Sequence, residues 1–459
     1  MTFLRPTLAV FCLWLAILAG PTRAETAATF TLPNGLQIVV LPDHRLPIVS
    51  HVLYIKAGSA DDPPGQSGIA HFLEHLMFKG TKRFPNGQYD HIVTLAGGTS
   101  NAYTSSDKTY YYEQVLRDGL ARMMELDADR MAGLEFAPIE AEHELKVVLE
   151  ERRSFDNDPD SVLAAKTARA LYGTAAYGHP VLGDWAETAA LTMPSALAFQ
   201  ARYYAPGSAI VVVAGDTTPG AVRDIAGAVY GKLPAGPAPP PRPGAASAPP
   251  CAEDKVAVRH ERVARDKASL VFLTPGADSM GEQSAAALKM LAASLEDQGS
   301  SPIWRDLSVQ QGLISGLAVS HDLKLAAGEF AITVEAESGV SAARLESALR
   351  DSLAALRLAG IAAPALADAK RHWLAARVLA ADDQLGTATR YGEQLAIGRT
   401  LAAIESEPQT IAAVTVADIN AVLGDYLPNR CFVTALLEGT GEPPDGPARV
   451  PAHAGSAVH

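Results

Sequence analysis

The spacing of apolar and polar residues predicts an alternation of short strands and longer helices. Residues 28–40 form two β-rich arms around Pro33-Asn34-Gly35, which predicts a hairpin with a tight turn. Two further apolar runs of strand length lie at 48–57 and 209–214. Helices are predicted, in chain order, over residues 68–80, 86–95, 116–131, 138–153, 161–173, 193–204 and 284–295. This mixture predicts the α+β class, with mostly antiparallel sheets and helices packed on one face of each.

A proline-rich stretch, Lys232–Pro250, divides the chain into two parts of similar plan. Its composition predicts an extended, semi-rigid linker with no core of its own. After it, Leu270–Asp278 parallels Leu53–Asp61, and Tyr426–Leu437 parallels Tyr204–Gly215, both at an offset of about 220 residues. We therefore expect two related domains, each large enough for its own core. The expected parts are a first domain over 25–231, the linker over 232–250, a second domain over 251–438 and a disordered Gly/Pro/Ala-rich tail over 439–459.

Residues 1–24 have the composition of a secretory signal peptide. Arg5 supplies the positive start, Leu8–Ala19 an apolar stretch, and Thr22–Ala24 a cleavage site of small residues. The apolar stretch is too short for a comfortable membrane span, although an uncleaved anchor is the alternative. We therefore expect a periplasmic or secreted protein with no stable membrane anchor.

Charge and cysteine content narrow the classes of partner and of metal site. The formal net charge is −13, and removal of Arg5 and Arg23 with the signal makes it −15. Such an acidic chain is poorly suited to nucleic acid or anionic membranes. Cys12 falls within the signal, while Cys251 and Cys431 either form one disulfide or remain two buried thiols. A metal site in this chain would therefore use histidine and carboxylate ligands.

The chemistry concentrates in the predicted helix Gly68–Gly80, which contains the pattern H-x-x-E-H. His71 and His75 are four residues apart, so both imidazoles project from one face and suit two ligands on one zinc ion. Glu74 lies at the edge of the same face, where a carboxylate can act as general base without ligating the metal. Because a catalytic zinc needs three protein ligands, the motif requires one more residue from elsewhere.

The candidate for this third ligand lies on the helix that begins at Pro138, a residue suited to a first helical position. Glu144 and Glu151 are seven residues apart and therefore lie two turns along one helical face. Taken alone, Glu151 in the charged run 150–153 would more often be a solvent-facing residue.

H-x-x-E-H followed by E-x-x-V-V-x-E-E resembles the pitrilysin/insulinase family of zinc peptidases, and its half-length members of the mitochondrial processing peptidase type in particular. The resemblance implies that Glu151 is the third zinc ligand and that Glu144 supports the site, although a salt bridge to Lys or Arg would explain Glu144 equally well. It also implies a fold in which two related halves face each other like a clamshell.

The resemblance continues through Gly97–Tyr112, which contains the family's N-A-x-T strand and the strand that follows it. It implies that Asn101, Ala102 and Thr104 lie on an edge strand that holds a peptide substrate by strand addition. Taken alone, Asn101 near two glycines would more often be a turn residue.

The second half lacks the zinc motif and departs from the family at one further place. Active members often carry an Arg and a Tyr that bind substrate, where this chain has Ser308 and Ser315, and Arg305 is out of register. Since half-length members often work in pairs, we expect a heterodimer with a homologous subunit that supplies the Arg/Tyr pair. The alternatives are that Arg390-Tyr391 substitutes for the pair or that this segment has drifted neutrally.

The sequence thus predicts an exported endopeptidase with Zn²⁺ as cofactor, His71, His75 and Glu151 as ligands, and Glu74 as the base. Two other interpretations stay open. The clamshell could be a non-catalytic subunit that binds peptides or supports assembly, as the missing Arg/Tyr pair suggests, or the zinc could be structural. The intact H-x-x-E-H with Glu151 argues against both.

Overall fold

The computed structural model describes residues 27–85, 87–237, 255–427 and 432–440. The predicted signal peptide, residues 238–250 of the predicted linker, Cys251 and Cys431 lie outside these ranges, as does the predicted tail beyond residue 440. The two alternatives for Cys251 and Cys431, one disulfide or two buried thiols, therefore both stay open.

The first half of the described chain builds one six-stranded sheet. In spatial order its strands are β1 (Ala28–Thr31), β2 (Gln37–Pro42), β6 (Ala209–Gly215), β3 (Ile48–Ile55), β5 (Thr109–Leu116) and β4 (Thr99–Thr104). All neighbours are antiparallel except β2 and β6, and the predicted hairpin is the β1–β2 pair. Strands β3 and β6 are buried along nearly their whole length, which explains the unbroken apolar run of β6 and the mainly apolar sequence of β3.

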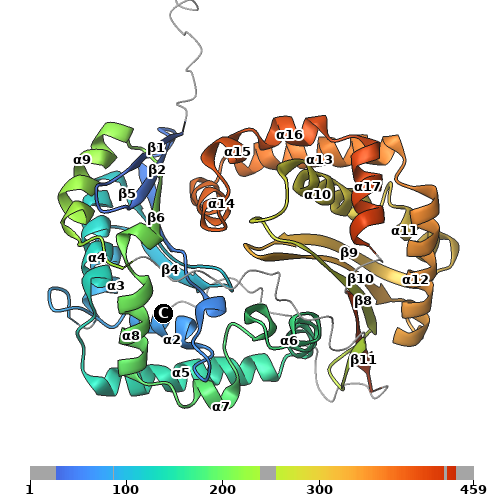
Figure 1. Cartoon of the computed structure of the whole chain (residues 1–459), viewed down its shortest axis with the longest axis horizontal. Coiled ribbons are helices and arrows are strands. Elements are labelled where there is room, and N and C mark those ends of the chain that lie inside the picture. The colour runs from blue at the N-terminus through green and yellow to red at the C-terminus, as the bar shows by residue number, and fades with distance from the viewer. Residues whose placement is uncertain (1–26, 86, 238–254, 428–431, 441–459) are drawn as a thin grey trace, which may run out of the picture.

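The helices of the first half pack mainly against one face of this sheet (Figure 1). They are α2 (Ile69–Leu76), α3 (Gln88–Leu95), α4 (Leu120–Ala132), α5 (Pro138–Asp156), α7 (Trp185–Thr188), α8 (Met193–Tyr203) and α9 (Pro219–Val229). The prediction of a helix from residue 116 was wrong at its start. Strand β5 pairs with β3 as far as Leu116, and a 3-10 turn over residues 117–119 precedes α4.

The second half of the described chain repeats this topology. Its sheet has the spatial order β7 (Lys255–His260), β11 (Phe432–Gly439), β8 (Lys267–Pro275), β10 (Ala327–Ala336) and β9 (Ile314–Leu323). Only β7 and β11 are parallel neighbours, so the order and the one parallel pair match those of β2, β6, β3, β5 and β4. The duplication that the sequence predicted is therefore visible strand by strand.

The helices of the second half lie around its sheet (Figure 1). They are α10 (Glu282–Glu296), α11 (Pro302–Trp304), α12 (Ala342–Ala359), α13 (Ala363–Ala380), α14 (Gln384–Ala396), α15 (Leu401–Glu405), α16 (Glu407–Ala413) and α17 (Val416–Tyr426). Within the described ranges, no single helix is long and apolar enough to cross a membrane, and only the pair α12–α13, bent by 106°, meets the length and composition together.

Each half gives one helix to the other. Helix α14 packs on β3 and β6 of the first sheet, where Ala388 and Leu395 join Tyr54 and Val212 in one core cluster. Helix α6 (Pro159–Tyr172) packs in the same way on β7 and β11 of the second sheet. The α+β class and the clamshell arrangement are confirmed, and the exchanged helices connect the two halves across the space between them (Figure 1).

Candidate active site

The start of the helix that carries the H-x-x-E-H motif is fixed by a half-buried carboxylate. Asp62 accepts hydrogen bonds from the backbone N–H of Gly68 at 2.7 Å and of Ala70 at 3.1 Å, at the N-terminus of α2. Gly68 has a φ of 88°, and a Cβ there would lie 2.8 Å from the carbonyl oxygen of Leu182. These contacts fix where the first turn of α2 begins. The sequence analysis did not identify Asp62.

Three predicted ligands converge, although they come from two different helices. Nε2 of His71 and Nε2 of His75 are 3.4 Å apart, and Oε2 of Glu151 on α5 lies 3.5 Å and 3.4 Å from them. Two ligands about 2.1 Å from a tetrahedral zinc ion would be about 3.4 Å apart. The donor set of two imidazoles and one carboxylate therefore fits a tetrahedral zinc with one position left open.

Glu144, two turns before Glu151 on α5, contacts the far side of His75. Its Oε1 lies 3.0 Å from Nδ1 of His75, and its other oxygen forms a salt bridge with Lys79. With Nδ1 engaged by Glu144, Nε2 of His75 is directed to the ligand cluster. Both contacts that the sequence left as alternatives are present, because Glu144 bridges the histidine and a lysine.

The charges around His75 act strongly on its protonation. Burial lowers the pKa of His75, but the carboxylates of Glu144 and Glu151 outweigh that effect and raise the pKa to about 9. Burial raises the pKa of Glu144, whereas His75 and Lys79 lower it by more, so that the net shift is downward. The carboxylates of Glu144 and Glu151 thus place negative charge beside His75, where a metal ion could bind in place of the proton.

Glu74 lies beside the cluster and contacts the edge of the sheet. Its Oε2 accepts a hydrogen bond from the Thr104 hydroxyl. Burial raises the pKa of Glu74 to about 7, with the Thr104 hydrogen bond acting in the opposite direction. A carboxylate with a pKa near neutrality can both accept and return a proton at physiological pH.

The predicted substrate strand, β4, lies at one edge of the first sheet. In the described part of the chain it pairs with β5 alone, so its other side offers backbone groups to an added strand. The Ala102 N–H donates to Oδ1 of Asn101 at 2.8 Å. Thr104 points to Glu74, so its hydroxyl supports the predicted base, whereas the next residue toward the N-terminus, Tyr103, is 55% exposed.

The two second-half positions that depart from the family take part in local structure. Ser308 lies in a π-helical turn over Arg305–Gln310, and the Ser315 hydroxyl donates to the Ala336 carbonyl at 2.9 Å between β9 and β10. Arg390 lies on α14 with its guanidinium carbon 4.7 Å from the centre of the Tyr391 ring. Burial and then the charge of Arg377 lower the pKa of Arg390.

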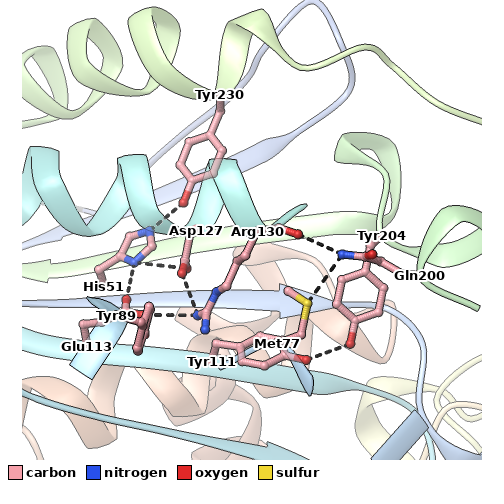
Figure 2. A network of polar contacts seen from close by, with 10 residues as sticks. All are labelled: His51, Met77, Tyr89, Tyr111, Glu113, Asp127, Arg130, Gln200, Tyr204 and Tyr230. Carbon is pink, nitrogen blue, oxygen red and sulfur yellow. Dashed lines mark hydrogen bonds and ion pairs between the residues drawn. The ribbon is translucent and has the colours of Figure 1, made fainter. Parts of the chain in front are cut away.

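A second group of metal-type side chains lies beneath the first sheet, where the sequence analysis predicted no site. His51, Glu113 and Asp127 bring one ligand atom each to within 4.8 Å of one another (Figure 2). Arg130 already supplies the cation, with Nη2 2.6 Å from Asp127 and 3.2 Å from Glu113. The available signal was an Asp and an Arg at i and i+3 on the apolar face of α4.

Comparison with known families covers both halves. The family described as "Insulinase (Peptidase family M16)" matches residues 38–184, which include all three candidate ligands and Glu74. The family described as "Peptidase M16 inactive domain" matches residues 190–372.

Comparison with individual proteins gives the same result. An uncharacterized zinc protease of Mycobacterium bovis is 30% identical over 442 residues, covering 91% of this chain and 94% of that protein. The zinc protease PqqE of Helicobacter pylori is 38% identical over 188 residues, which are 40% of this chain but only 42% of that protein.

Solved structures share the whole architecture. A protease from Helicobacter pylori has a TM-score of 0.81 at 26% identity and covers 90% of this chain and 99% of its own. The periplasmic protease PqqL from Escherichia coli has a TM-score of 0.75 at 22% identity, covering 90% of this chain and 47% of its own, a likeness in fold alone.

Proposed function

Because the chain belongs to the M16 (insulinase) family of peptidases, we propose that it is a zinc-dependent endopeptidase that hydrolyses peptides or unfolded segments. The observation that carries the proposal is the convergence of His71, His75 and Glu151 at 3.4–3.5 Å, with the half-buried Glu74 beside them. That arrangement combines a metal-binding donor set with a separate base, which a purely structural zinc site does not need.

Each group has a defined task in this proposal. His71, His75 and Glu151 hold the metal, and Glu144 orients His75. When bound, zinc supplies the Lewis acidity that activates water and polarises the scissile carbonyl. Glu74 accepts the proton of the attacking water and returns it to the leaving amine, a transfer that its pKa of about 7 suits.

The edge strand β4 provides the place for the peptide. A substrate added antiparallel or parallel to β4 would bond through its main chain, with the backbone groups around Asn101 and Ala102 as partners. Ala102 N–H now bonds to the Asn101 side chain, so substrate would replace that contact or use the neighbouring groups. Thr104, the last residue of β4, directs its hydroxyl to Glu74 and so supports the base through its side chain.

The absence of the Arg/Tyr pair supports a two-subunit enzyme in which this chain carries the zinc. Ser308 and Ser315 occupy the corresponding positions, and both lie in regular local structure. A homologous subunit would supply the missing pair. The predicted signal at residues 1–24, together with the fold likeness to a periplasmic protease, supports export to the periplasm.

The test compares the mature, zinc-loaded chain with its Glu74→Gln variant on a mixed peptide library. We expect cleavage by the parent chain once the homologous subunit is added, a loss of at least about 100-fold when the variant replaces the parent, and one zinc per chain in both. Glu150→Gln, one helical position from Glu151 and 66% exposed, serves as the matched control and should cleave like the parent.

Two outcomes would contradict parts of the proposal. Loss of zinc from Glu74→Gln would mean that Glu74 is a ligand and not the base. Stoichiometric zinc without cleavage, both in the parent chain alone and with a co-purifying homologue, would reject the peptidase, whereas cleavage that requires the homologue would support the heterodimer.

A further inference from the structure

A buried network of charged and polar side chains lies behind the candidate active site, on the helix-covered face of the first sheet. His51 on β3 contacts Glu113 on β5 at 2.8 Å and the Tyr230 hydroxyl at 3.0 Å (Figure 2). Asp127 on α4 lies 3.5 Å from His51. The side chains of His51, Glu113 and Asp127 are fully buried, so each charge depends on its neighbours within the network.

Arg130 is the centre of this network. Its guanidinium pairs with Asp127 at 2.6 Å and with Glu113 at 3.2 Å, and its side chain is 2% exposed. The same group lies over three aromatic rings, with distances to the ring centres of 5.4 Å for Phe78, 4.7 Å for Tyr89 and 4.4 Å for Tyr111. A planar guanidinium can stack on rings while its edge holds carboxylates, which an ammonium group cannot do.

The charges of the network can balance one another without a bound metal ion. Two carboxylates face one guanidinium, so one additional proton, shared between His51 and Asp127, makes the set neutral. The raised pKa of both groups agrees with this reading; for each of them burial is the largest influence, and the neighbouring charges decide the outcome for His51. This proton neutralises the negative charge that a second cation would otherwise have to balance.

The network reaches the metal ligands through the end of α2. Phe78, whose ring Arg130 contacts, lies only three residues after the candidate zinc ligand His75 in the chain. Gln200 on α8 donates to the Arg130 carbonyl at 2.8 Å and contacts the Met77 sulfur at 3.6 Å. The C-terminal end of α2 is thus held from two sides by contacts that meet at Arg130.

The network also reaches the substrate strand. Tyr111, the ring nearest to Arg130, pairs with Ala102 across β5 and β4, and its hydroxyl lies 2.8 Å from that of Tyr204 (Figure 2). One side chain therefore contacts both the segment that follows His75 and the strand that flanks β4. The distance between the metal ligands and the edge strand depends on both.

We propose that Arg130 is a positioning residue of the peptidase site, which sets the C-terminal end of α2 against β5 and thereby the geometry of the zinc ligands relative to β4. This inference rests on the proposed function. Removing the planar guanidinium should therefore alter the metal site through Phe78 and Tyr111, although Arg130 contacts none of the candidate zinc ligands.

The experiment replaces Arg130 by Lys, which keeps the charge and removes the stacking plane. We expect zinc to bind about tenfold more weakly, the visible spectrum of the Co²⁺-substituted protein to change, and kcat to fall with KM within about twofold. Arg122→Lys is the matched control, since Arg122 lies on the same helix over the Phe84 ring at 4.6 Å but is 43% exposed and outside the network. It should match the parent in all three measurements.

A second variant covers the case in which Arg130→Lys does not fold. Phe78→Leu keeps an apolar side chain but removes the ring over which Arg130 lies, and we expect the same change of the Co²⁺ spectrum and of zinc affinity. In the double variant Arg130→Lys/Phe78→Leu, the loss of zinc affinity should be smaller than the sum of the losses in the two single variants, because each substitution breaks the same contact. Unchanged zinc affinity and Co²⁺ spectrum in folded Arg130→Lys, or in Phe78→Leu if the former is unfolded, would overturn the inference.

Metal affinity and the Co²⁺ spectrum do not depend on turnover. If the parent chain cleaves nothing, either alone or with the homologous subunit, the proposed function fails while these two measurements still decide the role of Arg130. If the parent cleaves peptides and the variants bind metal as it does, the function stands and the positioning role fails.

Discussion

The contact between Glu144 and His75 allows a quantitative test of the candidate metal site. The change is Glu144→Gln, which keeps the shape of the side chain and an oxygen that can accept from Nδ1 of His75, now 3.0 Å away. It removes the negative charge that this histidine and Lys79 both contact. The variant therefore isolates the charge of an outer residue from the geometry of the ligand itself.

The expected size follows from the type of hydrogen bond. A bond to a charged group contributes about 1.5–3 kcal/mol and a neutral one about 0.5–1.5 kcal/mol, so losing the charge costs about 1–1.5 kcal/mol. The salt bridge of Glu144 with Lys79 is also lost, and Glu144 is only 7% exposed, so solvent replaces little of either contact. We expect zinc to dissociate about 5- to 30-fold more readily, which overlaps the lower part of the roughly 10- to 100-fold range usual for outer-shell partners of metal-binding histidines.

The assay is competition between the protein and a chromophoric chelator of known zinc affinity, at a pH where the variant remains folded. Glu150→Gln on the same helix is the control, because Glu150 is 66% exposed and pairs with Arg153. A zinc dissociation constant for Glu144→Gln within twofold of the parent would refute the reasoning, since it would mean that the charge of Glu144 does not reach the metal through His75.

Three further changes test other parts of the structure. Thr104→Val removes the hydrogen bond that lowers the pKa of Glu74, so the acidic limb of the kcat/KM profile should move to higher pH and the rate at pH 6 should fall about 3- to 10-fold. An unmoved acidic limb would contradict the assignment of Glu74. Asp127→Asn removes a carboxyl group whose pKa is raised to about 7 by burial. The folded protein holds the proton of this carboxyl group more tightly than the unfolded chain does. The protonated group therefore stabilises the fold at low pH, and this stabilisation is lost as the pH rises from about 4 through 7. The free energy of unfolding should therefore decline less steeply between pH 5 and 8 in the variant, and equal slopes in denaturant titrations would refute this. Gly392→Ala places a Cβ 1.9 Å from the Tyr54 ring, where α14 of the second half meets the first sheet, and should lower the free energy of unfolding by about 1–3 kcal/mol. An unchanged denaturant midpoint would show that α14 shifts without cost.

The sequence by itself determined the local chemistry and the plan of the chain. An i, i+4 pair of histidines lies on one helical face whatever surrounds it, so His71 and His75 could be placed together from spacing alone. The largely apolar sequences of β3 and β6 predicted strands, and the repeated segments indicated two related halves. Each of these depends on residues near one another in the chain or on self-similarity of the chain.

Only the tertiary structure decided what side chains from distant segments do together. The sequence predicted a substrate-binding role for Thr104, and only the structure shows that its hydroxyl also donates to Glu74, because β4 contacts α2. Asp62 became the support of α2 through a loop whose path no periodicity specifies. Packing of α14 and α6 on the sheet of the opposite half likewise depends on how the halves meet.

The buried network is the clearest case of that limit. In the sequence, Asp127 and Arg130 are a charged i, i+3 pair on the apolar face of a helix, and no local pattern connects them with His51 and Glu113 in the strands. Their charges become tolerable in the core only because β3, β5 and α4 bring them within hydrogen-bond distance of one another. Local pattern fixes which face of an element a side chain occupies, whereas the pairing of buried charges depends on which faces the fold brings into contact.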